Sequence, residues 1–100
     1  MDINITSKAV EKLKEMMGKK GQTQKNVRIL ISGIGWGGPR FGIALDEQKE
    51  NDKMVKTEAL NFIIEEELAN QINTFNIDYK DFFLNRGFQI YADGYNASFC

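Results

Sequence analysis

The chain has 100 residues, with 13 Lys and Arg against 14 Asp and Glu, and a formal net charge of -1. This balance does not predict a nucleic-acid footprint or an anchor for an anionic membrane, so we expect neither as a partner. The chain has no histidine and a single cysteine, Cys100. Because no imidazole is available as a general base, any thiol or soft-metal chemistry must involve Cys100.

Length and hydropathy predict one soluble domain. Hydrophobic residues make up 42% of the chain, and no apolar run approaches the roughly 20 residues that span a bilayer. The first six residues show no basic region followed by an apolar core, so no export signal is predicted. We expect a single domain over residues 1–94, a flexible tail over 95–100, and a cytoplasmic location, where a lone thiol stays reduced.

The first half of the chain predicts a helix and then a hairpin. Thr6 or Ser7 can cap the helix and Gly18 can end it. The apolar residues at helical spacing are Ala9, Val10, Leu13, Met16 and Met17, and we expect the two methionines in the core. Alternating apolar residues then predict two paired strands, one with Val27, Ile29 and Ile31 and one with Phe41, Ile43 and Leu45.

The second half predicts further short strands and one more helix. Strands are expected around residues 54–56 and 60–64, followed by a helix from Glu65 to about Ile72. Alternation continues at residues 75–79 and 87–92, up to the turn signal Asp93-Gly94. About six strands and two helices, without regular strand–helix alternation, predict a strand-rich α+β domain with mixed short strands.

The glycine-rich stretch between the first two strands has two interpretations. Gly33, Gly35 and Gly38 match the G-x-G-x-x-G spacing of dinucleotide sites. That motif needs a helix N-terminus for the pyrophosphate, whereas here Pro39 leads into a strand, so we do not predict nucleotide binding. The glycines either form a permissive loop between paired strands or a functional one.

Trp36 is the candidate contact residue of a functional glycine loop. A large aromatic side chain among glycines is either tucked into an interface or exposed for contact. Either way, we predict an interaction loop formed by Gly35, Trp36, Gly37 and Gly38.

No catalytic group is predicted from spacing, so we do not expect an enzyme. Asp46, Glu47, Glu50 and Asp52 lie in a predicted turn, where carboxylates are usually solvated. Asp78 lies on a predicted strand and could face a pocket, but no neighbour in sequence would orient it as a base.

Cys100 also allows two interpretations. It is either a chemically incidental end of the chain or a ligand that meets a metal or another chain. Two subunits together would supply two thiolates. A thiol redox function would require a second thiol, which is absent, and a cation beside the first; Arg40 and Arg86 are the candidates.

Several short landmarks occur in an order that resembles one known family. They are Ile5-Thr6 with Ala9 and Leu13, Val27-Arg28-Ile29, the glycine loop followed by Phe41, Leu45-Asp46-Glu47, Glu50-Asn51-Asp52, Ile77-Asp78-Tyr79 and Gly87-Phe88. Together they resemble the A-type iron-sulfur carriers, the HesB/IscA family. The resemblance implies a compact HesB-like fold, a homo-oligomer, and three cysteines that bind iron or a [2Fe-2S] cluster for delivery to client or assembly proteins.

This chain departs from that family at the ligands. Aligned without gaps from Val27 to Glu47, the family's loop cysteine falls on Trp36. Cys100 lies near the first tail cysteine, and the second would follow it, so two of the three family cysteines are absent. The resemblance therefore implies Cys100 as the remaining metal ligand. HesB-like proteins with selenocysteine in the tail resemble this arrangement, which gives the hypothesis of a selenoprotein shortened at its tail.

Two functions follow as hypotheses. The first is iron-sulfur cluster assembly or iron and cluster delivery through Cys100. The alternative keeps the fold without metal and uses the Trp36 loop as a protein-interaction module, with a thiol or selenol redox protein as a third reading.

Overall fold

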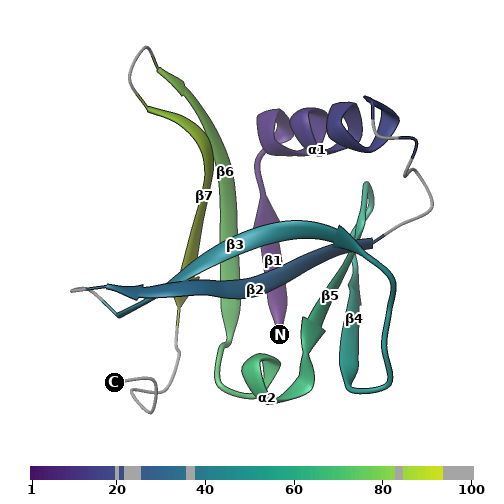
Figure 1. Ribbon diagram of the computed structural model, residues 1–100, viewed down its shortest axis with the longest axis vertical. Helices are drawn as coiled ribbons and strands as arrows, with labels where there is room; N and C mark the ends of the chain where they lie inside the picture. The colour runs from purple at the N-terminus through teal and green to yellow at the C-terminus, as the bar shows by residue number, and fades with distance from the viewer. Residues whose placement is uncertain (20, 22–25, 36–37, 83–84, 94–100) are drawn as a thin grey trace.

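Short segments of alternating apolar residues build most of this protein into strands. The computed structural model describes residues 1–19, 21, 26–35, 38–82 and 85–93 (Figure 1). In chain order, the elements are β1 (Asp2–Ile5), α1 (Ser7–Lys19), β2 (Asn26–Gly35), β3 (Gly38–Asp46), β4 (Asp52–Lys56), β5 (Asn61–Glu65), α2 (Glu66–Ala69), β6 (Thr74–Phe82) and β7 (Asn85–Asp93).

The strands form two mixed sheets. The four-stranded sheet has the order β3-β2-β5-β4, and the three-stranded sheet has the order β1-β6-β7. Two pairings are parallel: β2 with β5, where Val27 lies opposite Phe62, and β1 with β6, where Ile3 lies opposite Phe75. The three hairpin pairings, β2–β3, β4–β5 and β6–β7, are antiparallel. Sequence-adjacent strands therefore pair locally, and the parallel pairings bring distant segments together.

The core lies between the sheets and beneath α1. Phe62 and Phe75 are fully buried, and the ring of Phe41 on β3 meets that of Phe75 edge to face at 5.1 Å. The helix contributes its buried face, formed by Ala9, Leu13 and Met17. Of the two methionines that the sequence predicts in the core, Met17 is buried and Met16 is half-buried.

The first helix begins where the sequence predicts. The N–H of Ala9 donates a hydrogen bond to Oγ1 of Thr6 at 3.2 Å, which satisfies one of the free amides at the helix start. Thr6 is therefore the capping residue, and Ser7 is the first helical residue.

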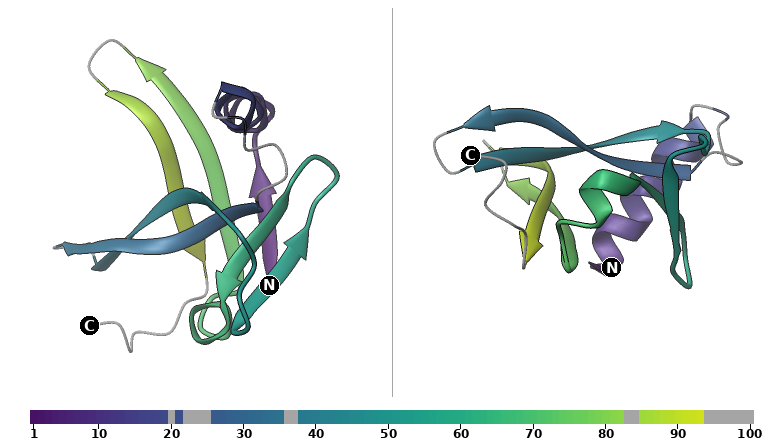
Figure 2. Two further views of the ribbon diagram at one scale, coloured as in Figure 1. Left: turned by 45° about the vertical axis from the view of Figure 1, so that its right-hand side comes forward. Right: turned by 90° about the horizontal axis from the view of Figure 1, so that it is seen from below.

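Two hairpins extend beyond the packed region. Figure 1 shows β2 and β3 crossing the other strands and projecting to one side, while the far ends of β6 and β7 project upward. The left-hand view of Figure 2 shows the same two projections. The pairing of β2 with β5 ends at Ile29, so from Leu30 onward β2 pairs only with β3. We call residues 30–35 and 38–42 the hairpin arm.

The predicted α+β class, with mixed short strands and two helices, is confirmed. The strand β1 was not predicted. One prediction of detail is wrong: the second helix ends at Ala69 instead of near Ile72, because the chain turns at residues 70–73 to enter β6. None of the helices in the described residues has the length and apolar content needed to cross a membrane. The division into residues 1–94 and 95–100 stays a prediction.

Candidate functional site

The predicted interaction loop begins and ends at the tip of the hairpin arm. Gly35 and Gly38 lie opposite each other as the last described pair of β2 and β3. Trp36 and Gly37, between them, lie outside the described residues, as does Cys100. The structure thus places Gly35 and Gly38 side by side. Their position relative to Cys100 stays a prediction.

A β-bulge shapes the arm just before its tip. The register of β2 against β3 shifts between Ile31 and Gly33, which leaves Ser32 as the extra residue. Oγ of Ser32 donates a hydrogen bond to the backbone carbonyl of Arg40 at 3.3 Å. Past the bulge, the side chain of Arg40 crosses Gly35: a Cβ built on Gly35 would lie 3.1 Å from Nε of Arg40. The absence of a side chain at residue 35 therefore allows this guanidinium to lie against the backbone.

The arm also exposes apolar surface. Ile34 is 75% exposed and Ile31 is 37% exposed, and they are two of the three large hydrophobic residues that are exposed in the described part of the chain. Arg40 forms no ion pair with a carboxylate among the described residues, whereas Arg28 pairs with two and Arg86 with one. In the register of the hairpin, Ile31 and Ile34 lie opposite Phe41 and Pro39, so they share the face of the arm that Arg40 does not occupy. Exposed apolar side chains gathered on one face are typical of contact surfaces.

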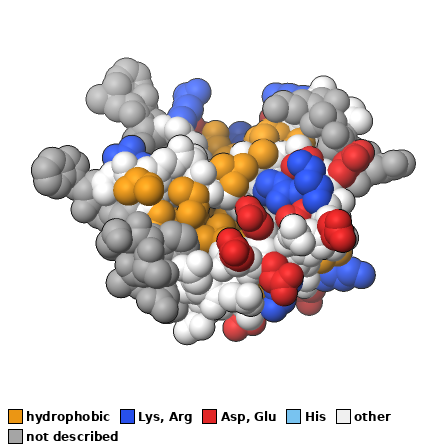
Figure 3. Space-filling model, turned by 60° about the horizontal axis from the view of Figure 1, so that its bottom comes forward, with side chains coloured by type: hydrophobic (Ala, Val, Ile, Leu, Met, Phe, Trp, Pro, Cys, Tyr) orange, Lys and Arg blue, Asp and Glu red, His pale blue; other side chains and the backbone are white. Residues whose placement is uncertain are grey.

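A cavity of about 300 Å³ lies at the base of the arm, between β2 and α2. Ile31 and Leu68 contribute apolar surface to it, and Glu65 and Glu67 contribute carboxylates. Figure 3, which brings the underside of the molecule forward, shows acidic side chains gathered on this face. Across the described residues, no group of three or more Asp, Glu, His or Cys side chains is arranged to hold a metal ion.

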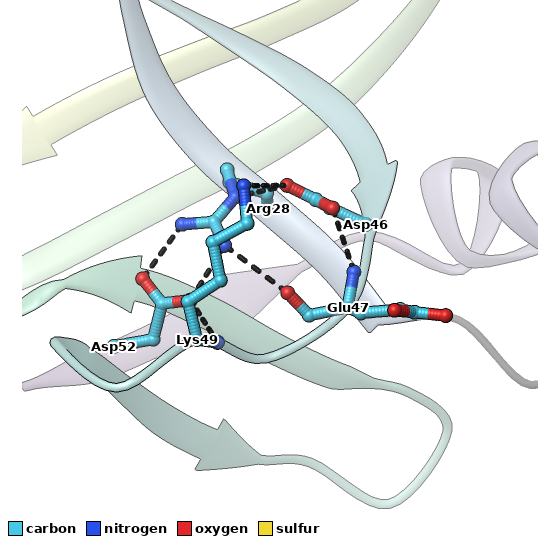
Figure 4. A network of polar contacts seen from close by, with 5 residues as sticks. All are labelled: Arg28, Asp46, Glu47, Lys49 and Asp52. Atoms are coloured by element: carbon cyan, nitrogen blue, oxygen red, sulfur yellow. Dashed lines mark hydrogen bonds and ion pairs between the residues drawn. The ribbon is translucent and has the colours of Figure 1, made fainter.

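Arg28 anchors the base of the arm to the neighbouring loop (Figure 4). Its Nε donates to Asp46 at 2.8 Å, its Nη1 to Asp52 at 2.7 Å, and its Nη2 to the carbonyl of Glu47 at 3.3 Å. Asp52 also accepts a hydrogen bond from the N–H of Lys49 at 2.7 Å. The network joins β2, the end of β3 and the start of β4.

This network corrects the prediction that the four carboxylates of the 46–52 turn are solvated. Glu47 and Glu50 are exposed as expected, but the side chain of Asp52 is only 4% exposed. Hydrogen bonds from Arg28 hold the pKa of Asp52 and that of Asp46 below their ordinary range. The signal that could have revealed the pairing was a single arginine in the otherwise apolar run from Val27 to Ile31.

Hydrogen bonds and an ion pair within the fold hold the carboxylate of Asp78 in place. It accepts hydrogen bonds from Oγ1 of Thr6 at 2.9 Å and from the N–H of Tyr79 at 2.8 Å, and it lies 3.2 Å from Nζ of Lys80. The Thr6 hydrogen bond is the largest cause that lowers its pKa. The carboxylate therefore ties the start of α1 to β6 and is held in its charged form.

Of the two arginines considered as thiol activators, Arg86 already forms an ion pair with a carboxylate. Its Nε lies 2.9 Å from Oδ1 of Asp81, near the turn between β6 and β7. Arg40 lies at the arm instead. The two arginines thus belong to different hairpins.

Comparisons with known proteins point in one direction. The chain is 29% identical over 80 residues to the iron-sulfur cluster insertion protein ErpA of Francisella tularensis subsp. novicida, a match that covers 79% of this chain and 69% of that protein. A similar match, at 28% identity over the same length and coverage, is to ErpA of Francisella philomiragia. No family model matches the chain.

Solved structures share the fold. A crystal structure of IscA with a [2Fe-2S] cluster superposes with a TM-score of 0.74 at 22% identity, covering 91% of this chain and 85% of that one. Escherichia coli SufA, described as involved in the biosynthesis of iron-sulfur clusters, gives a TM-score of 0.71 at 17% identity, covering 90% of this chain and 79% of that one. The arrangement of the two sheets and two helices is therefore that of these proteins.

Proposed function

We propose that this chain, which belongs in sequence and fold with the A-type iron-sulfur carriers of the HesB/IscA family, binds iron or a [2Fe-2S] cluster as cargo for delivery to other proteins. The observation that carries the proposal is the joint agreement of the sequence with a cluster insertion protein and of the fold with cluster-binding relatives. In this role the chain is a carrier and not an enzyme, and we expect it to act in the cytoplasm.

The ligand chemistry follows from what the chain contains. Cys100 is its only cysteine, and a thiolate is a preferred ligand for iron-sulfur clusters. Trp36, in the position of the family's loop cysteine, cannot substitute for it, because the indole nitrogen is a hydrogen-bond donor without a free lone pair. One thiolate from each of two chains would give a pair of ligands, so the proposal includes a homo-oligomer.

The test is anaerobic reconstitution with iron and sulfide, followed by measurement of bound iron in the wild-type chain and in Cys100→Ser. Ser98→Ala is the matched control, because it changes a polar residue of the same tail. We expect iron to fall to background in Cys100→Ser and to stay at the wild-type level in Ser98→Ala. Equal iron in all three proteins would refute the ligand role of Cys100.

The exposed apolar surface of the arm favours a second candidate function. Ile34 and Ile31 present an apolar contact surface that needs no metal. In this alternative, the arm and the Trp36 loop bind an iron-sulfur client or assembly protein. Trp36→Ala should then abolish capture of that protein while bound iron remains at background, and retained capture would count against it.

A further inference from the structure

The cavity at the base of the arm lies along an open edge of β2. Residues 28–31 are consecutive on β2, and all of them line the cavity. Because side chains alternate between the two faces of a sheet, a cavity that four consecutive residues line lies at the edge of their strand. The pairing with β5 ends at Ile29, and among the described strands none pairs with β2 on that side from Leu30 onward. Backbone N–H and C=O groups of alternate residues are therefore open to a further strand there.

The same cavity combines apolar and acidic side chains. Ile31 on β2, which is 37% exposed, and Leu68 on α2 line it, and Glu65 and Glu67 add carboxylates. An adjoining cavity of about 370 Å³ shares these two glutamates and adds Glu66. Figure 3 shows apolar and acidic side chains next to one another on this underside of the molecule. We call the two cavities together the α2 groove.

The carboxylates of the α2 groove are not balanced by a cation. The glutamates at residues 65–67 are exposed, and none forms an ion pair within the described part of the chain. Arg28 is the one described cation that lines either cavity, and its guanidinium already binds Asp46 and Asp52. Lys49 lies 3.7 Å from Asp46, so this network contains two cations and two carboxylates and is neutral. The negative charge of residues 65–67 therefore remains uncompensated.

Neighbouring cations do not offset this charge. Lys53 lies opposite Ile64 on β5, so its side chain is on the face of the sheet away from that of Glu65. Met1, which carries the terminal ammonium, and Lys56 line a separate cavity along β1. A cationic segment is therefore the occupant that the α2 groove favours.

We propose that the α2 groove binds an extended basic segment of a partner protein, which adds to β2 as a further strand at the base of the arm. Its lysine or arginine side chains pair with Glu65 and Glu67, and an apolar side chain between them packs on Ile31 and Leu68. The open edge of β2 selects a peptide over a small polyamine, because only a peptide supplies backbone hydrogen-bonding partners. The inference rests on the fold and is independent of iron binding.

The probe is the acetylated and amidated peptide Thr-Lys-Val-Lys-Val-Thr, and the control peptide has Gln in place of each Lys. The measurement is a titration of the isotopically labelled full chain, followed through its amide signals by NMR. We expect the lysine peptide to shift the amides of residues 30–31 and 65–68 with a Kd of about 1 mM. The glutamine peptide should bind about fivefold more weakly, which is the effect of two exposed ion pairs. No shift at these amides with the lysine peptide, or equal affinity for the two peptides, would overturn the proposal.

Paired substitutions test the carboxylates. Glu65→Gln combined with Glu67→Gln should weaken binding of the lysine peptide about fivefold and leave binding of the glutamine peptide unchanged. Glu47→Gln combined with Glu50→Gln is the matched control, because these exposed glutamates remove the same charge and line neither cavity. Equal weakening by the two pairs would assign the effect to net charge and overturn the role of the groove.

Two further lysine peptides, N-methylated at the odd or at the even positions, test strand addition. Only alternate N–H groups of an added strand face β2, so one methylated peptide should lose binding and the other should keep it. Equal binding of the two would refute strand addition. Shifts at residues 30–31 and 65–68 that grow with chain concentration alone would identify a second copy as the occupant and overturn the proposal.

Discussion

At the scale of single residues, Arg28 ties β2 to the end of β3 and to the start of β4. Its side chain is 14% exposed, and the guanidinium binds Asp46 and Asp52, which lie on separate strands. Removing it would leave the nearly buried carboxylate of Asp52 without its charged partner. Hydrogen bonds to charged groups contribute about 1.5–3 kcal/mol each, whereas exposed ion pairs contribute little.

We therefore expect Arg28→Met to lower the free energy of unfolding by about 2 kcal/mol in urea denaturation at neutral pH. Arg86→Met is the matched control, because its ion pair with Asp81 is largely exposed; its effect should stay within about 0.5 kcal/mol. Equal losses for the two variants would show that the Arg28 network contributes no more than a surface pair.

The same network predicts a pH dependence. Arg28 lowers the pKa of Asp52 and that of Asp46 from an ordinary value of 3.8. Such groups contribute stability that is fully present above the unfolded pKa and is lost as the pH falls through the lower, folded pKa. The stability gap between the wild-type chain and Asp52→Asn should therefore be constant near neutral pH and shrink below pH 3.8. A gap that stays constant down to full protonation would contradict this assignment.

At the scale of elements, features that depend on neighbouring residues were predicted well from sequence, whereas pairings between distant strands were not predicted. The cap at Thr6, the buried stripe of α1 and the β2–β3 hairpin all depend on neighbours in sequence, and the structure contains them. β1 was missed because Ile3 and Ile5 give only two alternating positions before the helix cap. Its partner, β6, lies at the opposite end of the chain. The early end of α2 reflects the turn that this same pairing requires.

The candidate site was predictable in part for the same reason. The glycines that flank the arm tip were found from sequence, and the structure pairs Gly35 with Gly38. The crossing of Arg40 over Gly35 depends on the bulge at Ser32, which the simple alternation of β2 does not reveal. The ligand role of Cys100 stays a prediction, because the residue lies outside the described part of the chain.

The β6–β7 hairpin contains a glycine that its backbone requires. Gly87 has a φ of 142°, in a region that other residues rarely adopt. Gly87→Ala should therefore destabilise the chain by about 1 kcal/mol or more, measured by thermal unfolding. Gly33→Ala is the control, since Gly33 has no positive φ and a Cβ there meets no atom within 4 Å. Indistinguishable melting temperatures for the two variants would contradict this backbone argument.

At the scale of the whole molecule, we propose the arm as the surface through which copies of the chain would form the homo-oligomer proposed above. A two-stranded projection with exposed isoleucines is marginally stable alone, so a contact that covers it would stabilise it. Ile34→Glu should abolish self-association measured by light scattering. Tyr91→Glu, a change at another exposed hydrophobic residue on β7, should not. Unchanged association of Ile34→Glu would move the contact away from the arm.

The central claim is that the chain carries an iron-sulfur cluster and passes it on. The most direct measurement is anaerobic transfer from the reconstituted chain to an apo-ferredoxin in the presence of an iron chelator, followed by circular dichroism of the acceptor. The proposal predicts that the acceptor signal appears despite the chelator, and that Cys100→Ser gives none. Transfer that the chelator abolishes, or that proceeds equally with Cys100→Ser, would contradict it.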